Sequence, residues 1–94
     1  MLTTKQTIKK WQDKLEIPKW DITLESIHPE QIEYNGENYF IGITRDFKNK
    51  RGVIYHDIDL YEEAIIHELL HIRYPTRNEE WVNKESKKLL KNDG

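Results

Sequence analysis

The 94-residue chain contains no cysteine, one methionine, three prolines and four glycines. The absence of cysteine excludes a disulfide scaffold, thiolate metal ligands and a thiol nucleophile. No run of residues approaches the roughly 18 apolar positions of a membrane span, and the N-terminus lacks the apolar core of a signal peptide. We therefore expect a soluble, cytoplasmic protein with no membrane partner.

Neither sign of charge dominates, because 15 Lys and Arg residues face 17 Asp and Glu residues and leave a net charge of −2. This balance argues against a general nucleic-acid-binding protein. A chain of this length buries roughly 60–65% of its unfolded surface, which allows one modest core. Three Trp, five Tyr and two Phe supply bulky material for that core. We expect a single domain over residues 1–94.

Hydrophobic periodicity predicts a helix followed by a small sheet. Residues 4–17 carry apolar side chains at spacings of three and four, which is typical of an amphipathic helix, and Pro18 ends it. Apolar and polar residues alternate over 20–25, which predicts a strand with one buried face. The Asn35–Gly36 pair indicates a hairpin, because a type I′ turn needs positive φ at both positions. With a further strand at 52–56, we predict three or four mostly antiparallel strands.

Two helix-start patterns follow the predicted sheet. Asp59-Leu-Tyr-Glu62 has the form of a capping box and predicts a helix that runs to about Arg73. Thr76-Arg-Asn-Glu79 has the same form and predicts a final helix to about Lys91. The order of an N-terminal helix, a small sheet and two C-terminal helices indicates an α+β fold.

The first of these two helices contains the sequence His67-Glu-Leu-Leu-His71, an H-E-x-x-H motif. Two histidines four residues apart lie on one face of a helix, so both imidazoles can bind one Zn²⁺. Glu68 can reach a water in the open coordination position and take its proton as a general base, without being a ligand. The alternative is that these residues line a solvated stripe of an amphipathic helix.

A catalytic zinc site normally has three protein ligands and an open fourth position. The downstream candidates for the third ligand are Glu79, Glu80 and Glu85. Glu79 shares the inward face of the final helix, Glu80 falls among lysines on the charged face, and Glu85 lies on the flank. We therefore select Glu79. The alternative is that Glu79 closes the capping box with the amide of Thr76.

These residues resemble the site of the gluzincin metallopeptidases, in which the third zinc ligand is a Glu on the next helix, often preceded by Asn, here Asn78. The short chain with one such helix pair behind a small sheet is similar to the minimal gluzincins (minigluzincins). The resemblance implies Glu68 as the general base and acid. Many gluzincins have an Asp four residues after the ligand Glu, whereas this chain has Asn83, which adds no charge. The implied zinc ligands are His67, His71 and Glu79.

Three functional hypotheses follow. The first is a zinc-dependent metallopeptidase in which Glu68 activates a zinc-bound water for attack on a peptide or protein substrate. The second is a zinc-binding module that is latent or non-catalytic and acts through a partner. In that case the tail 91–94 folds towards its own cleft or that of a second copy, which would make a homodimer. The third is a metal-free interaction domain.

Some residues outside the motif are weaker candidates. In zincins an edge strand above the cleft binds extended substrate, so the resemblance implies that strand 52–56 could pair with a peptide. The alternative is an ordinary core strand. Tyr55 and Tyr74 are candidate oxyanion donors or, alternatively, packing residues. His56 has no partner at ligand spacing, and we expect it at the surface.

Overall fold

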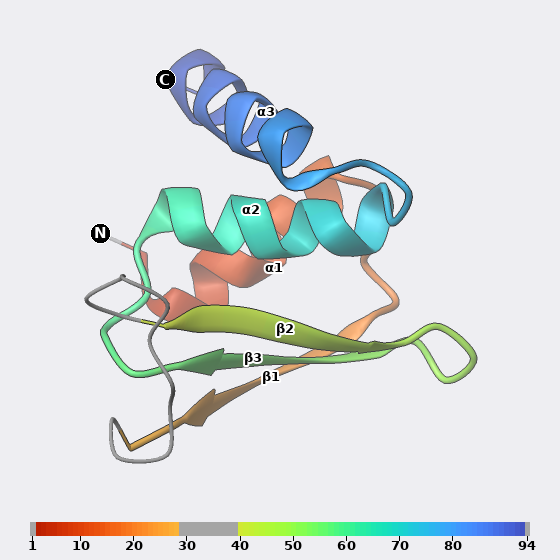
Figure 1. The fold of residues 1–94 in the computed structure, drawn as a ribbon, viewed down its shortest axis with the longest axis vertical. Helices are drawn as coiled ribbons and strands as arrows, with labels where there is room; N and C mark the ends of the chain where they lie inside the picture. Colours follow the sequence, from red (N-terminus) through yellow and green to blue (C-terminus); the bar gives the residue numbers. More distant parts are fainter. Residues whose placement is uncertain (1, 29–39, 94) are drawn as a thin grey trace. The chain divides into compact units, whose positions relative to one another are not determined.

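Within residues 2–28 and 40–93, which the computed structural model describes, the chain forms three helices and three strands (Figure 1). This order confirms the predicted α+β class with an N-terminal helix, a sheet and two C-terminal helices. The hairpin predicted at Asn35–Gly36 lies outside the described residues. The helices form one compact unit and the strands form a second. In chain order the elements are α1 (Thr4–Lys14), β1 (Asp21–Ser26), β2 (Ile41–Asp46), β3 (Arg51–His56), α2 (Glu62–Arg73) and α3 (Glu79–Asn92).

The described strands form a mixed sheet in the order β1-β3-β2. β3 runs parallel to β1, with Asp21 opposite Arg51, and antiparallel to β2, with Ile41 opposite His56. One of the two pairings is thus parallel, where the alternation of side chains alone suggested mostly antiparallel strands. A parallel pair needs a connection of about a dozen residues or more, and the chain passes through β2 between β1 and β3.

The central place of β3 corrects one expectation. Each residue from Arg51 to His56 has a partner on β1 and another on β2, so both backbone edges of β3 are already paired. The prediction that this strand could take up a peptide as an added strand is therefore wrong. β3 is the core strand of its sheet, and the side chain of Ile54 is completely buried.

In the helical unit, α2 packs against both α1 and α3 (Figure 1). α1 begins with a capping box between Thr3 and Gln6 and ends at Lys14, three residues before the predicted end. The chain leaves the helix there because Glu16 adopts a positive φ of 60°. Ile17 stays buried beyond the helix end, which explains why the apolar spacing continued to that residue.

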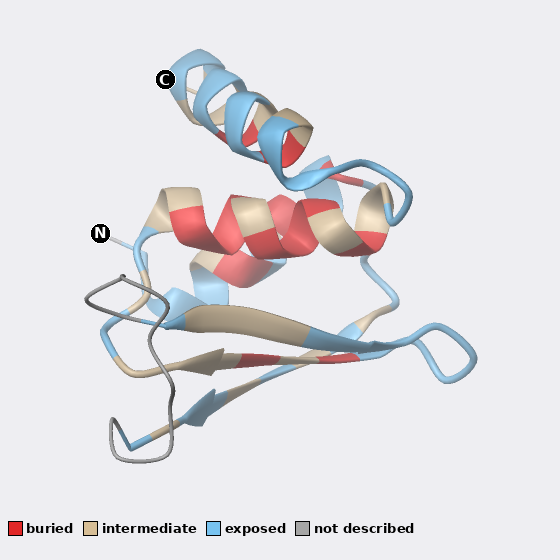
Figure 2. Ribbon diagram, in the orientation of Figure 1, coloured by how far each residue is buried: buried red, intermediate tan, exposed pale blue. Residues whose placement is uncertain are grey.

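α2 is buried over most of its surface (Figure 2), and it ends at Arg73 as predicted. Its N-cap is Tyr61, which makes no side-chain capping bond, so the predicted capping box from Asp59 to Glu62 is wrong. The carboxylate of Glu62 instead accepts hydrogen bonds from α1, as described below. The buried residues of α2 are Ala64, Ile65, Ile66, Glu68, Leu69, Leu70 and Ile72.

α3 begins at Glu79 because Asn78 caps it, with Asn78 Oδ1 accepting a hydrogen bond of 2.9 Å from the amide of Trp81. The predicted box from Thr76 to Glu79 is therefore wrong. Asn is among the preferred N-cap residues, and it stands immediately before the first helical residue. α3 buries Val82 and Ser86. Among the described residues, no helix has the length and apolar character needed to cross a membrane.

Candidate metal centre

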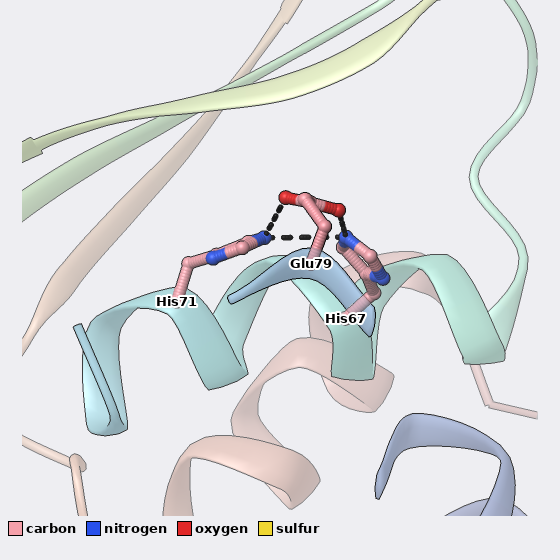
Figure 3. Close-up of side chains that lie close together, drawn as sticks. All are labelled: His67, His71 and Glu79. Atoms are coloured by element: carbon pink, nitrogen blue, oxygen red, sulfur yellow. Dashed lines mark hydrogen bonds and ion pairs between the residues drawn. The ribbon is translucent and has the colours of Figure 1, made fainter. Parts of the chain in front are cut away.

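His67 and His71 project from the same face of α2 (Figure 3). Their spacing of four residues brings the two Nε2 atoms to 3.2 Å from each other, and the ring planes stand at 69°. The side chains are 18% and 15% exposed. α2 is otherwise largely buried, so it offers two imidazole nitrogens along a narrow, partly open stripe.

Glu79 is the first residue of α3, and its carboxylate bridges the two imidazoles (Figure 3). Oε2 lies 3.0 Å from Nε2 of His67, and Oε1 lies 2.7 Å from Nε2 of His71. Because Asn78 caps α3, the carboxylate of Glu79 does not serve in the capping box that was its alternative role. Glu80 pairs at the surface with Lys84 at 3.2 Å. Of the three candidate glutamates, the structure thus brings Glu79 to the histidines.

The geometry of these three side chains fits a metal ion. The donor atoms of His67, His71 and Glu79 all lie within 4.8 Å of one another. Around a tetrahedral ion with bonds of about 2.1 Å, ligand atoms stand about 3.4 Å apart. The spacing of 3.2 Å between the histidine nitrogens is close to that value, and the carboxylate contacts of 3.0 and 2.7 Å are shorter than it by less than about 1 Å. The cluster can therefore hold a metal ion.

Glu68 lies beside this cluster without joining it. Its side chain is 7% exposed, and its Oε1 is 3.9 Å from Nε2 of His67. Glu68 precedes Leu69 and Leu70, which are completely buried, and this packing fixes the backbone from which its carboxylate projects. The structure thus places a shielded carboxylate next to the imidazole of His67 and outside the set of three candidate ligands.

A second charged cluster joins the other end of α3 to α1 and α2. Lys10 Nζ lies 2.6 Å from Asp93 Oδ2 and 2.9 Å from Glu62 Oε2, and Lys14 Nζ lies 2.9 Å from Asp93 Oδ1. The indole N–H of Trp11 donates to Glu62 at 2.7 Å. We call Lys10, Trp11, Lys14, Glu62 and Asp93 the helix-end cluster.

Hydrogen bonding shifts the pKa values within the helix-end cluster. The hydrogen bond from Trp11 and, to a lesser extent, the hydrogen bond from Lys10 lower the pKa of Glu62. Hydrogen bonds from Lys10 and, to a lesser extent, from Lys14 lower the pKa of Asp93. The hydrogen bonds that Lys10 donates to Asp93 and, second, to Glu62 raise the pKa of Lys10. Asp93 is thus held against α1. The expectation that the tail folds into the chain's own cleft is wrong for this residue, because Asp93 follows the C-terminal end of the 14-residue α3, whereas Glu79 begins it.

The remaining candidates divide between the two units. The ring of Tyr74 packs edge-to-face on Trp81 with centroids 5.2 Å apart, which supports the packing role. Asn83 is exposed, and within the described part of the chain its side chain makes no hydrogen bond to either histidine. His56 Nδ1 lies 2.8 Å from the carbonyl oxygen of Ile58 in the sheet unit. Tyr55 is on β3, and its oxyanion role stays a prediction.

An aromatic contact at the loop between α2 and α3 was not predicted from the sequence. Tyr74 and Trp81 bracket this loop, and Arg73 and Arg77 lie over their rings. The spacing in the sequence was the available signal. Arg73 stands one position before Tyr74 and Arg77 four positions before Trp81, and each of the two aromatic residues lies within three positions of a ligand candidate.

No family model, no curated protein and no solved structure matches this chain.

Proposed function

We propose that this chain is a zinc-dependent metallopeptidase of the gluzincin type, with His67, His71 and Glu79 as the zinc ligands. The observation that carries the proposal is the convergence of two imidazoles from α2 and one carboxylate from α3. Two histidines and a glutamate, with a fourth position left for water or substrate, are a ligand set of catalytic zinc. Zinc is favoured over magnesium or calcium, because those ions prefer oxygen ligands.

Zinc held by His67, His71 and Glu79 would supply a Lewis acid to polarise the attacking water and the carbonyl of the scissile peptide bond. Glu68 takes a proton from that water and returns it to the leaving amine, so one carboxylate acts as base and then as acid. Its position supports this role, because it is buried beside His67 but stands outside the ligand set. Hydrolysis in this scheme needs no covalent intermediate with the protein.

The substitution Glu68→Gln tests this function, since it keeps the size of the side chain and removes its basicity. We expect unchanged zinc stoichiometry and a fall in the hydrolysis of a mixed peptide library by about 10²–10⁴-fold, the usual contribution of a general base. Glu80→Gln is the matched control, because Glu80 pairs with Lys84 at the surface, and we expect it to retain activity.

Three outcomes separate the hypotheses. Wild-type rates in Glu68→Gln would contradict the assigned mechanism. A wild-type chain that binds zinc and cleaves no peptide would instead support the non-catalytic zinc-binding module. A chain that takes up no zinc would favour a metal-free interaction domain.

A further inference from the structure

The loop that joins α2 to α3 is held by a stack of four side chains. The ring of Tyr74, the residue after α2, meets the ring of Trp81, the third residue of α3, with centroids 5.2 Å apart and planes at 69°. The guanidinium of Arg73 lies 4.8 Å from the centre of the Tyr74 ring, and that of Arg77 lies 4.8 Å from the Trp81 ring. We call Arg73, Tyr74, Trp81 and Arg77 the loop stack.

Backbone hydrogen bonds tie the residues of the loop stack to the end of α2 and to the start of α3. The amide of Tyr74 donates to the carbonyl of Leu70 at 2.8 Å, and the amide of Arg77 donates to the carbonyl of Tyr74 at 3.1 Å. The amide of Trp81 donates to the capping side chain of Asn78. The ring contact therefore fixes the last turn of α2 relative to the first turn of α3.

The metal-ligand candidates stand directly beside these two turns. His71 is three residues before Tyr74, and Glu79 is two residues before Trp81. The carboxylate of Glu79 is 67% exposed, and in the described part of the chain all its ion pairs are with His67 and His71. Local packing therefore does little to hold this carboxylate, and its position depends on where α3 begins relative to α2.

We propose that Tyr74 and Trp81 are positioning residues, which act through Glu79 to place its carboxylate against the two histidines. This inference rests on the metal site of the proposed function, but not on peptide hydrolysis. Edge-to-face aromatic pairs have a preferred geometry, and a guanidinium on each ring limits its freedom further. The loop stack thus preorganises a ligand that solvent would otherwise leave mobile, and it does so without touching the metal.

The substitution Trp81→Ala removes the ring contact. We expect the Kd for zinc, measured by competition with a chromophoric chelator, to rise about tenfold, as when a supporting contact of a metal ligand is lost. Trp20→Ala is the matched control. Trp20 forms an edge-to-face pair with Phe47 at 5.3 Å in the sheet unit, so its loss removes a similar contact and leaves the affinity for zinc unchanged.

A double-mutant cycle separates positioning from general destabilisation. In a Glu79→Ala background, we expect Trp81→Ala to cause no further loss of affinity, because the carboxylate that it positions is absent. Trp81→Phe retains an aromatic ring and should restore most of the affinity. If Trp81→Ala does not fold, Tyr74→Leu removes the ring pair from the other side while it retains apolar bulk, and the same tenfold rise is expected.

The outcomes distinguish this inference from the proposed function. Wild-type affinity in folded Trp81→Ala, or an equal loss with and without Glu79, would overturn the positioning role. A wild-type chain that binds zinc and shows the expected cycle, but cleaves no peptide, would support the positioning role and contradict the peptidase. A wild-type chain that binds no zinc would overturn both.

Discussion

The two ends of α3 each carry a carboxylate that reaches another helix, but the groups around the two carboxylates differ. At the N-terminal end, Glu79 lies against two imidazoles of α2 at 3.0 and 2.7 Å. At the C-terminal end, Asp93 lies against two ammonium groups of α1, from Lys10 at 2.6 Å and Lys14 at 2.9 Å. Glu79 is 67% exposed, whereas Asp93 is 16% exposed.

This difference shows that the partners of a carboxylate decide its role. In the helix-end cluster, two lysines balance Glu62 and Asp93, so the charges are satisfied within the protein. At the other end, no lysine or arginine of the described residues forms an ion pair with Glu79. Its imidazole neighbours offer lone pairs when neutral, so the three side chains at this end could hold a metal ion. One end stabilises the helices, and the other can bind a metal.

Of the substitutions that test this difference between the two ends of α3, we expect Glu79→Ala to have the largest effect. This change should raise the Kd for zinc at least about a hundredfold, because losing a ligand costs more than the 10–100-fold cost of losing an outer hydrogen-bond partner. Asp93→Ala should leave the Kd unchanged, since the two residues are separated by the length of α3, about 21 Å. Zinc titration of both variants, with Glu80→Ala as a surface control, measures the difference. Loss of zinc in Asp93→Ala would contradict the separation of the two ends.

The next effect concerns stability at the opposite end. Trp11→Phe retains most of the buried ring and removes the indole N–H that donates to Glu62 at 2.7 Å. We expect the free energy of unfolding to fall by about 1–2 kcal/mol, towards the lower end of the roughly 1.5–3 kcal/mol typical of hydrogen bonds to charged groups, because the side chain of Glu62 is 34% exposed. The Kd for zinc should not change. Chemical denaturation of the metal-free protein provides the measurement, and unchanged stability would show that the hydrogen bond contributes nothing.

How far the sequence predicted this arrangement depends on the range of the interactions involved. The side-chain period of α2 placed His67 and His71 on one face, because that period is set locally. The helical face on which each residue falls also favoured Glu79 over Glu80 as the third ligand, and the structure brings Glu79 to the histidines. It does so although Glu79 is mostly exposed, because this first residue of α3 reaches across the loop rather than pointing into the core.

The helix caps and the sheet order were less predictable. Asn78 caps α3 in place of Thr76, two residues earlier, because several polar side chains near a helix start compete for the same amides. Likewise, Glu62 accepts hydrogen bonds from Lys10 and Trp11, residues about fifty positions away, instead of closing the predicted capping box with Asp59. The parallel pairing of β1 with β3 is also a long-range choice that alternation within a strand does not encode.

The smallest effect is the pH dependence of the helix-end cluster. The pKa of Glu62 lies below its ordinary value of 4.5, and that of Asp93 lies below 3.8. The unfolded chain therefore binds protons at these residues at a higher pH than the folded chain does. Their stabilising contribution is complete above those ordinary values and is lost as the pH falls through the folded pKa values. The pKa of Lys10 is raised above 10.5, so its contribution is lost only as the pH rises beyond that value.

The substitution Lys10→Met isolates this dependence, because it removes a donor of both carboxylates and retains the apolar part of the side chain. We expect a shallower decline of stability in acid than in the wild type, with the two curves converging at the lowest pH. Urea unfolding of both proteins from neutral pH into acid measures the difference. Lys84→Met is the control, since Lys84 pairs only with Glu80 among the described residues and both side chains are more than three-quarters exposed. If the stability of Lys10→Met and that of the wild type fell in parallel with pH, the hydrogen bonds from Lys10 would not lower the pKa values of Glu62 and Asp93 in the folded state.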